Sequence, residues 1–181
     1  MENGATRRLA DRAAFLVSQT AVVAPIESGP VSRLSGAVNV AYRADALVDV
    51  DDHDGLGAND WIHQRDLHDR GGVLIADDTI RVAHDQSCSL AEFTAMHFHA
   101  GRATAGFLRG ELTPRGRLRL LAIGVAPYIR LARVIGTLNE RGHGPAARRA
   151  WPIMLWLLYA QAAGQFIGSL SGPGDSARRL P

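Results

Sequence analysis

The sequence predicts an α/β domain over residues 1–110, then an interfacial helix with a basic loop over 111–149, and a transmembrane helix over 150–174. Three observations support this prediction. Amphipathic helical runs alternate with short strand-like runs before Gly110. After Gly110 the chain becomes apolar and rich in arginine. Its last long segment carries no charged residue over 25 positions.

The N-terminal region begins with a predicted helix. Residues 6–23 place apolar side chains at helical spacing with arginines between them, and Pro25 is expected to end this helix. A loop rich in glycine, proline and serine follows, and a second helix is expected to start near Arg43. The aspartate-rich stretch at 48–60 has the composition of a loop.

A helix–turn–strand unit follows the aspartate-rich stretch. Residues 60–69 predict a short helix that ends at the glycine pair Gly71–Gly72. The runs 73–76 and 79–83 are typical of strands, and the turn residues Asp77–Asp78 separate them.

A longer helix is predicted after residue 89. Ser89 and Glu92 form the S-x-x-E pattern of a capping box, which marks a helix start. A mostly apolar helix face continues through Gly101 to Phe107. His97 and His99 are two positions apart, so we expect them on different faces of this helix and not joined at one metal.

Arginines decide how the apolar C-terminal segments are interpreted. Arg130 and Arg133 interrupt the apolar run after Gly110, which favours a helix lying in the membrane interface. Segment 150–174 exceeds the roughly 20 residues that a spanning helix needs. Its two tryptophans and one tyrosine suit an interfacial belt. A buried helical hairpin is the alternative interpretation of these segments.

The charge distribution indicates an anionic membrane surface as a partner. All 20 basic residues are arginine. Residues 1–100 hold 8 arginines and 15 acids, whereas residues 101–181 hold 12 arginines and 3 acids. Because the basic half is also the apolar half, we expect contact with lipid and not with nucleic acid.

Arginines at the two ends of the predicted span bear on its orientation. Arg141, Arg148 and Arg149 flank its N-terminal end, which under the positive-inside rule faces the cytoplasm. Arg178 and Arg179 lie beyond the other end and oppose this orientation. We expect a membrane protein whose active face is cytoplasmic.

Shorter motifs favour solvated loops over metal centres. Three His-Asp pairs occur, but the first lies in a predicted loop and the third follows a strand, whereas His-Asp phosphohydrolases hold such pairs on packed helices. The Asp-x-Asp at 49–51 lies in the aspartate-rich loop and not at a strand end. Cys88 is the only cysteine, so no disulfide can form within the chain.

Four motifs follow one another in a specific order between residues 36 and 102. They are GAVNVAYRADAL at 36–47, ANDWIHQRDLHDRGG at 58–72, VLIADDTIRVAH at 73–84 and a helix that reaches Gly101–Arg102. In this order they resemble the acceptor-side half of family 2 glycosyltransferases, which have the GT-A fold. The segment from Ala150 to Ser176 is similar to the closing membrane segment of membrane-bound members. The resemblance covers roughly residues 20–176 and implies a partial GT-A-like domain.

The resemblance implies roles for individual residues. Inverting sugar transfer needs a carboxylate that accepts the proton of the acceptor hydroxyl as its oxygen attacks the anomeric carbon, and by resemblance this base is Asp60. His84 matches a position that ligates a divalent metal, Mg or Mn, which would hold the leaving diphosphate. Asn39 and Arg43 match the acceptor pocket, and Arg102 is placed to meet a phosphate or lipid head group.

Each of these residues also has a structural interpretation that the sequence leaves open. Asp60 is a candidate helix N-cap, His84 a satisfied histidine at a strand end, and Asn39 a turn residue. Arg43 and Arg102 are also candidates for ordinary surface charges.

The predicted function is transfer of a sugar from a nucleotide-sugar donor to a lipid-linked or polysaccharide acceptor. Two departures from the family pattern bear on it. Asn59 occupies the usual place of a glutamate, and the βα units that bind the nucleotide have no counterpart before residue 36. We therefore expect a separate nucleotide-binding half and a chain that is incomplete as an enzyme alone. The alternative is a non-catalytic membrane-anchored remnant, or a binding partner of another glycosyltransferase subunit.

Overall fold

The computed structural model describes residues 1–32, 34, 40–46, 60–110, 113, 116 and 124–180. The α-helices within these residues are α1 (Leu9–Ser18), α2 (Asp60–Asp69), α3 (Leu90–Phe107), α5 (Ala126–Glu140) and α6 (Gly144–Ser171). Short 3-10 helices are η2 (Ala44–Ala46), η3 (Leu108–Gly110) and η4 (Ser176–Arg179). The strands are β1 (Glu2–Asn3), β2 (Gly29–Val31), β3 (Leu74–Ala76) and β4 (Ala83–His84). Long helices with a few short strands make the chain mixed α/β, as predicted.

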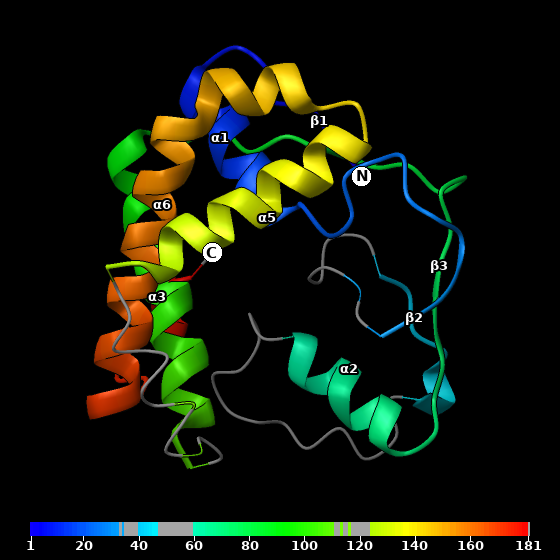
Figure 1. Ribbon diagram of the computed structural model, residues 1–181. Coiled ribbons are helices and arrows are strands. Elements are labelled where there is room, and N and C mark those ends of the chain that lie inside the picture. Colours follow the sequence, from blue (N-terminus) through cyan, green and yellow to red (C-terminus); the bar gives the residue numbers. More distant parts are fainter. Residues whose placement is uncertain are drawn as a thin grey trace.

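Helix α6 is the central element of the helical part. It runs beside α3, and α1 and α5 also pack on it (Figure 1). The core between α1, α5 and α6 buries apolar side chains from all three helices, among them Phe15, Leu138 and Met154. Phe93 of α3 and Leu157 of α6 form a second buried cluster with α1. Burial of these faces is the main stabilising term for the helical part.

Helices α3 and α6 approach each other through a glycine seam, formed by Gly101, Gly164 and Gly168. A Cβ atom at Gly164 would overlap the carbonyl oxygen of Phe98, and one at Gly168 would overlap that of Arg102. A Cβ atom at Gly101 would likewise overlap a backbone carbonyl of α6. The glycines therefore let the two backbones touch, which fixes how the side chains beside the seam face one another.

The strands pair with partners far away in the sequence. Strand β3 pairs antiparallel with β2, and Val31 lies opposite Leu74. Strand β4 pairs parallel with β1, and Asn3 lies opposite His84. The predicted run 73–76 is confirmed as a strand over Leu74–Ala76. Of the predicted run 79–83 only Ala83 lies in a strand, because the turn after Asp77 continues to Ile80, whose N–H donates to the Asp77 carbonyl. Each strand joins the N-terminal segment instead of the other. Among the described residues the sheets are two-stranded, and a GT-A-like domain stays a proposal.

Local signals in the middle of the chain predicted the helices well. Helix α2 spans the predicted residues and is followed by a turn in which Gly71 has a positive φ. At the start of α3, the Ser89 backbone N–H donates to the Glu92 carboxylate (2.6 Å) and the Glu92 N–H donates to the Ser89 hydroxyl (3.2 Å). The capping box is confirmed, and α3 continues through Gly101.

Two helix boundaries differ from those predicted. Helix α1 ends at Ser18, well before Pro25, because the chain turns there through Val22 and Val23 N–H groups that donate to the Gln19 carbonyl. Helix α6 begins at Gly144, so Arg148 and Arg149 are helical and the predicted basic loop is shorter.

One local feature is consistent with the early start of α6. Pro145 stands in the first turn of α6, where its missing N–H costs no helical hydrogen bond. Near Arg43, where a helix was expected to start, the described residues form the 3-10 helix η2, and the residues that follow Ala46 up to 59 lie outside the described part of the chain.

Candidate functional site

His84 lies on β4 beside α1. Its Nε2 atom is 3.2 Å from Oε1 of Gln86, and its ring centroid is 6.1 Å from that of Phe15 on α1. The side chain is half-buried. These neighbours favour the interpretation of a hydrogen-bonded histidine at a strand end.

Asp60 is the first residue of α2, and its side chain lies outside the part of the chain that the structure describes. Asn39 lies outside the described residues as well. In Figure 1, α2 lies in the lower part of the view, whereas β1, the partner of β4, lies in the upper part beside α1. The described fold therefore does not bring the start of α2 next to His84.

Arg43 forms a two-pronged ion pair with Asp45 in η2. Its Nε and Nη2 atoms are 3.0 and 2.7 Å from the two carboxylate oxygens. Both side chains are exposed, and the pairing lowers the pKa of the Asp45 carboxyl. An exposed pair of this kind contributes little to stability, so the guanidinium stays accessible to a ligand.

Arg102 links α3 to the end of α6. Its Nε atom donates to the carbonyl oxygen of Gly172, at 3.4 Å, and its guanidinium lies against Gly174. Gly172 is the residue that follows α6. A cation at this place stabilises the carbonyl end of the helix. Gly101 and Arg102 thus have a structural role, because Gly101 is part of the glycine seam and Arg102 hydrogen-bonds the residue that follows α6.

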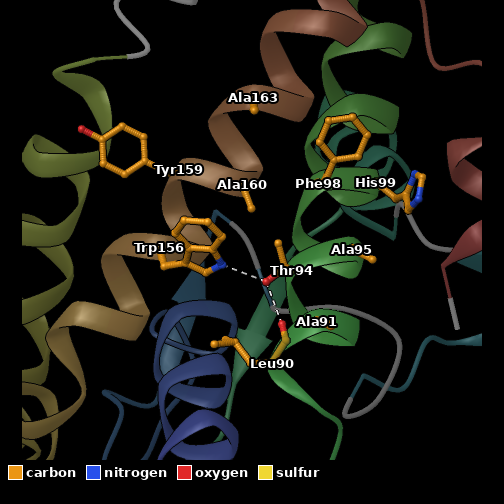
Figure 2. Close-up of a pocket in the computed structure, with 10 residues that line it drawn as sticks. All are labelled: Leu90, Ala91, Thr94, Ala95, Phe98, His99, Trp156, Tyr159, Ala160 and Ala163. Carbon is orange, nitrogen blue, oxygen red and sulfur yellow. Dashed lines mark hydrogen bonds between the residues drawn. The ribbon is translucent and has the colours of Figure 1, made fainter.

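An apolar groove between α3 and α6 was not predicted from the sequence. Its volume is about 870 Å³. The residues that line it are Leu90, Ala91, Thr94, Ala95, Phe98, His99, Trp156, Tyr159, Ala160 and Ala163. Figure 2 shows Ala160 between the rings of Trp156 and Phe98, so that small residues form the floor and rings form the walls.

The polar atoms of the groove walls are largely engaged within the protein. The Trp156 Nε1–H donates to the Thr94 hydroxyl (2.9 Å), which itself donates to the Leu90 carbonyl (2.7 Å). The Tyr159 hydroxyl donates to the Gly124 carbonyl (2.9 Å), and its ring packs edge-on against Tyr128 of α5. The walls therefore offer mainly apolar surface to a ligand.

His99 lines the groove and contacts the C-terminal segment of the chain. His99 Nδ1 is 3.0 Å from the Ser176 hydroxyl in η4, and Arg102 follows His99 by three helical positions. Burial lowers the pKa of His99, with further lowering by Arg179 and Arg102 against an opposing effect of Asp175. Burial and the two guanidiniums therefore favour the neutral form of the imidazole.

His97 lies on a different face of α3 from His99, as predicted. It is buried, and its Nε2 atom is 3.5 Å from the Ser18 hydroxyl of α1. Burial, with Arg130 as a smaller cause, lowers the pKa of His97 to about 4. Among the described residues, no group of three histidine, cysteine or acidic side chains could hold a metal ion.

Helix α6 is long and apolar enough to cross a membrane, and it is the one such helix among the described residues. Only 28% of its most apolar window is buried. Large apolar side chains of α6 and α5 stand exposed, namely Trp151, Trp156, Ile167, Leu170, Tyr128 and Ile129. A largely uncovered apolar helix favours contact with lipid over a role as a soluble core helix.

No protein-family model, no curated protein and no solved structure matches this chain. The resemblance to family 2 glycosyltransferases therefore depends on the order of its motifs alone.

The groove did leave a signal in the sequence. Ala91 and Ala95 on α3, and Ala160 and Ala163 on α6, repeat at intervals of three or four residues, as positions on one helix face do. The spacing indicates which helix faces carry small residues, but it does not indicate which helix each face will contact. Two small-residue faces form a groove only when the helices meet, and that meeting depends on the glycine seam.

Proposed function

We propose that this chain is the acceptor-side part of a membrane-associated glycosyltransferase. It would transfer a sugar from a nucleotide-sugar donor to a lipid-linked or polysaccharide acceptor at the cytoplasmic face. One observation carries the proposal. The Gly101–Arg102 step and the apolar tail, which both belong to the resemblance, pack together through the glycine seam and the Arg102–Gly172 hydrogen bond. Two segments that the resemblance covers, although far apart in the sequence, thus pack against each other.

In this proposal Asp60 is the general base. Its carboxylate accepts the proton of the acceptor hydroxyl while the hydroxyl oxygen bonds to the anomeric carbon and the nucleoside diphosphate leaves. Asn39 and the exposed Arg43 shape the acceptor pocket. The donor would be held by a nucleotide-binding half, either in the same polypeptide or in another.

The described residues do not fit a metal centre of their own. The Nε2 atom of His84 is engaged with Gln86, and no cluster of metal-ligating side chains surrounds it in the described part of the chain. Carboxylates and imidazoles that hold a divalent ion occur in sets of several ligands. We therefore derive no step through a metal ion held by this chain.

Membrane attachment would follow from α5 and α6. The exposed apolar side chains of these helices enter the lipid, and arginines near their ends contact anionic head groups. This arrangement would hold a lipid-linked acceptor close to the catalytic part.

The test is sugar transfer by the full chain, co-expressed in membranes with a nucleotide-binding half. We expect transfer from a radiolabelled nucleotide sugar only when both parts are present. Asp60→Asn should nearly abolish transfer. Asp69→Asn, at the exposed end of the same helix, is the matched control and should leave it unchanged. Full turnover by the Asp60→Asn variant would remove Asp60 from the mechanism.

A second candidate is a non-catalytic membrane-anchored partner of another glycosyltransferase subunit. The separation of α2 from β4 in Figure 1 favours it, because a base and a diphosphate-binding histidine should share one cleft. In that case transfer by the partner would be enhanced equally by the wild-type chain and by the Asp60→Asn variant.

A further inference from the structure

A second pocket is lined by residues of strand β1, helix α1 and the first turn of helix α6. We propose that this pocket binds a small apolar molecule that carries one carboxylate and one N–H or O–H donor, which is the chemistry of an apolar amino acid or hydroxy acid. The pocket contains none of the residues assigned to sugar transfer. The inference therefore goes beyond the proposed function and does not depend on it.

The pocket has the size and the mixed lining of a small-molecule site. Its volume of about 400 Å³ falls within the roughly 300–1,000 Å³ that is typical of such sites. Its apolar lining includes Phe15, Leu16 and Val23, which also belong to the buried core between α1, α5 and α6. Because the core holds these side chains in place, the apolar part of the pocket is formed before a ligand enters.

Arg12 is the lining residue that selects a carboxylate. Its Nε atom donates to the Thr6 carbonyl (3.1 Å), and within the described part of the chain no acidic side chain pairs with its guanidinium. Arginine forks bind carboxylates and phosphates. The other lining guanidinium, that of Arg81, is already paired with Asp78 at 2.7 Å and with Glu2 at 3.2 Å. A single uncompensated cation matches a monoanion, and the Glu2 carboxylate in the lining disfavours the second charge of a phosphate.

Asn3 is the lining residue that selects a hydrogen-bond donor. Its Oδ1 atom is buried and has no hydrogen-bond partner among the described residues. A buried acceptor without a donor is destabilising, and a ligand N–H or O–H that donates to it removes this cost. The backbone at Asn3 is held by the pairing of β1 with β4, opposite His84. An uncompensated cation, an unpaired acceptor and an apolar lining in one pocket therefore match the three parts of the proposed ligand.

The test is titration calorimetry on the full chain in mild detergent, with phenyllactate and phenylalanine as the probes. We expect saturable binding of at least one probe, and the comparison of the two separates an O–H donor from an N–H donor. The analogue 3-phenylpropionate lacks the donor and should bind about tenfold more weakly. Arg12→Gln should weaken binding of the preferred probe about tenfold. The matched control is Arg7→Gln, at an exposed arginine that does not line the pocket, and it should leave binding unchanged.

Two further variants separate binding from folding. Thr6→Trp places a large ring at an exposed lining position, so it should weaken binding about tenfold without a change in the melting temperature. Asn3→Ala should abolish the preference for the probe over 3-phenylpropionate, which a purely structural role of Asn3 would leave intact. The inference is overturned if neither probe binds saturably, or if wild type, Thr6→Trp and Arg12→Gln bind equally. Equal binding of the probe and 3-phenylpropionate by the wild-type chain would also overturn it.

Discussion

Substitution of Gly164 by alanine should destabilise the protein, although alanine is the better helix former. A Cβ atom at this position would overlap the carbonyl oxygen of Phe98 and crowd the backbone nitrogen of Arg102. Both obstacles are backbone atoms, so α3 and α6 must move apart to accommodate the new methyl group. Overpacking of this kind costs typically about 1–3 kcal/mol, and we take the upper end because no side chain can rotate away.

The gain in helix propensity from glycine to alanine is about 1 kcal/mol, which leaves a net loss of about 2 kcal/mol. For a chain of this size that loss corresponds to a melting temperature lower by roughly 4–8 °C. The matched control is Gly136→Ala on α5, where a Cβ atom would meet no neighbour within 4 Å. This control should raise the melting temperature, since only the propensity gain remains.

The assay is thermal unfolding of both variants and the wild-type chain in one mild detergent, followed by far-ultraviolet circular dichroism. The decisive result is that Gly164→Ala lowers the melting temperature whereas Gly136→Ala raises it. If Gly164→Ala melts at or above the wild-type temperature, the close contact between α3 and α6 is absent.

Three further predictions concern the helix start, a buried histidine and the membrane face. Ser89→Ala should lower the free energy of unfolding by about 1 kcal/mol in the same melts, because it removes the acceptor of the capping box. An unchanged melt would show that the box is not formed. Because burial lowers the pKa of His97 to about 4, the unfolded chain takes up a proton first, and stability is lost as pH falls from about 6.5 toward about 4. Melts across this range should show a steeper loss for wild type than for His97→Gln, and parallel curves would contradict the assignment. Glutamate at both Ile167 and Leu170 should shift the chain from the membrane pellet to the supernatant, whereas glutamate at Ile80, which is also exposed but lies outside α6, should not. Continued sedimentation of the double variant would rule out membrane contact through this end of α6.

The sequence predicted those elements whose signals are local. The capping box at Ser89 is complete within four residues, and the glycine pair after Asp69 ends α2 where a positive φ is required. Segment 150–174 was identified as helical from its composition, although its helix begins earlier, at Gly144. Each of these depends on neighbours within one or two helical turns.

Features that join distant segments were not predicted. Strands β3 and β4 lie next to each other in the sequence, yet their partners β2 and β1 come from the first 31 residues. Periodicity reports which face of a strand is apolar but not which strand it will meet. The groove was missed for the same reason, since its shape depends on the register of α6 against α3.

The same difference between local and long-range contacts applies to the proposed site residues. The environment of Arg102 could not be anticipated, because its partner Gly172 is 70 positions away. His84 has a hydrogen-bond partner only two residues further on, which is a local arrangement that the interpretation as a strand-end histidine anticipated.

Because their backbones are in contact along the glycine seam, α3 and α6 form one closely packed helix pair. If lipid holds α6 at a given depth, the depth of α3 is fixed as well, because Thr94 and Gly101 lie beside Trp156 and Gln161 of α6. A chimaera that replaces α6 but keeps α3 would no longer hold α3 at a fixed depth, even if the new helix enters the membrane well. Transplanting the pair together, from Ser89 to Arg179, would preserve it.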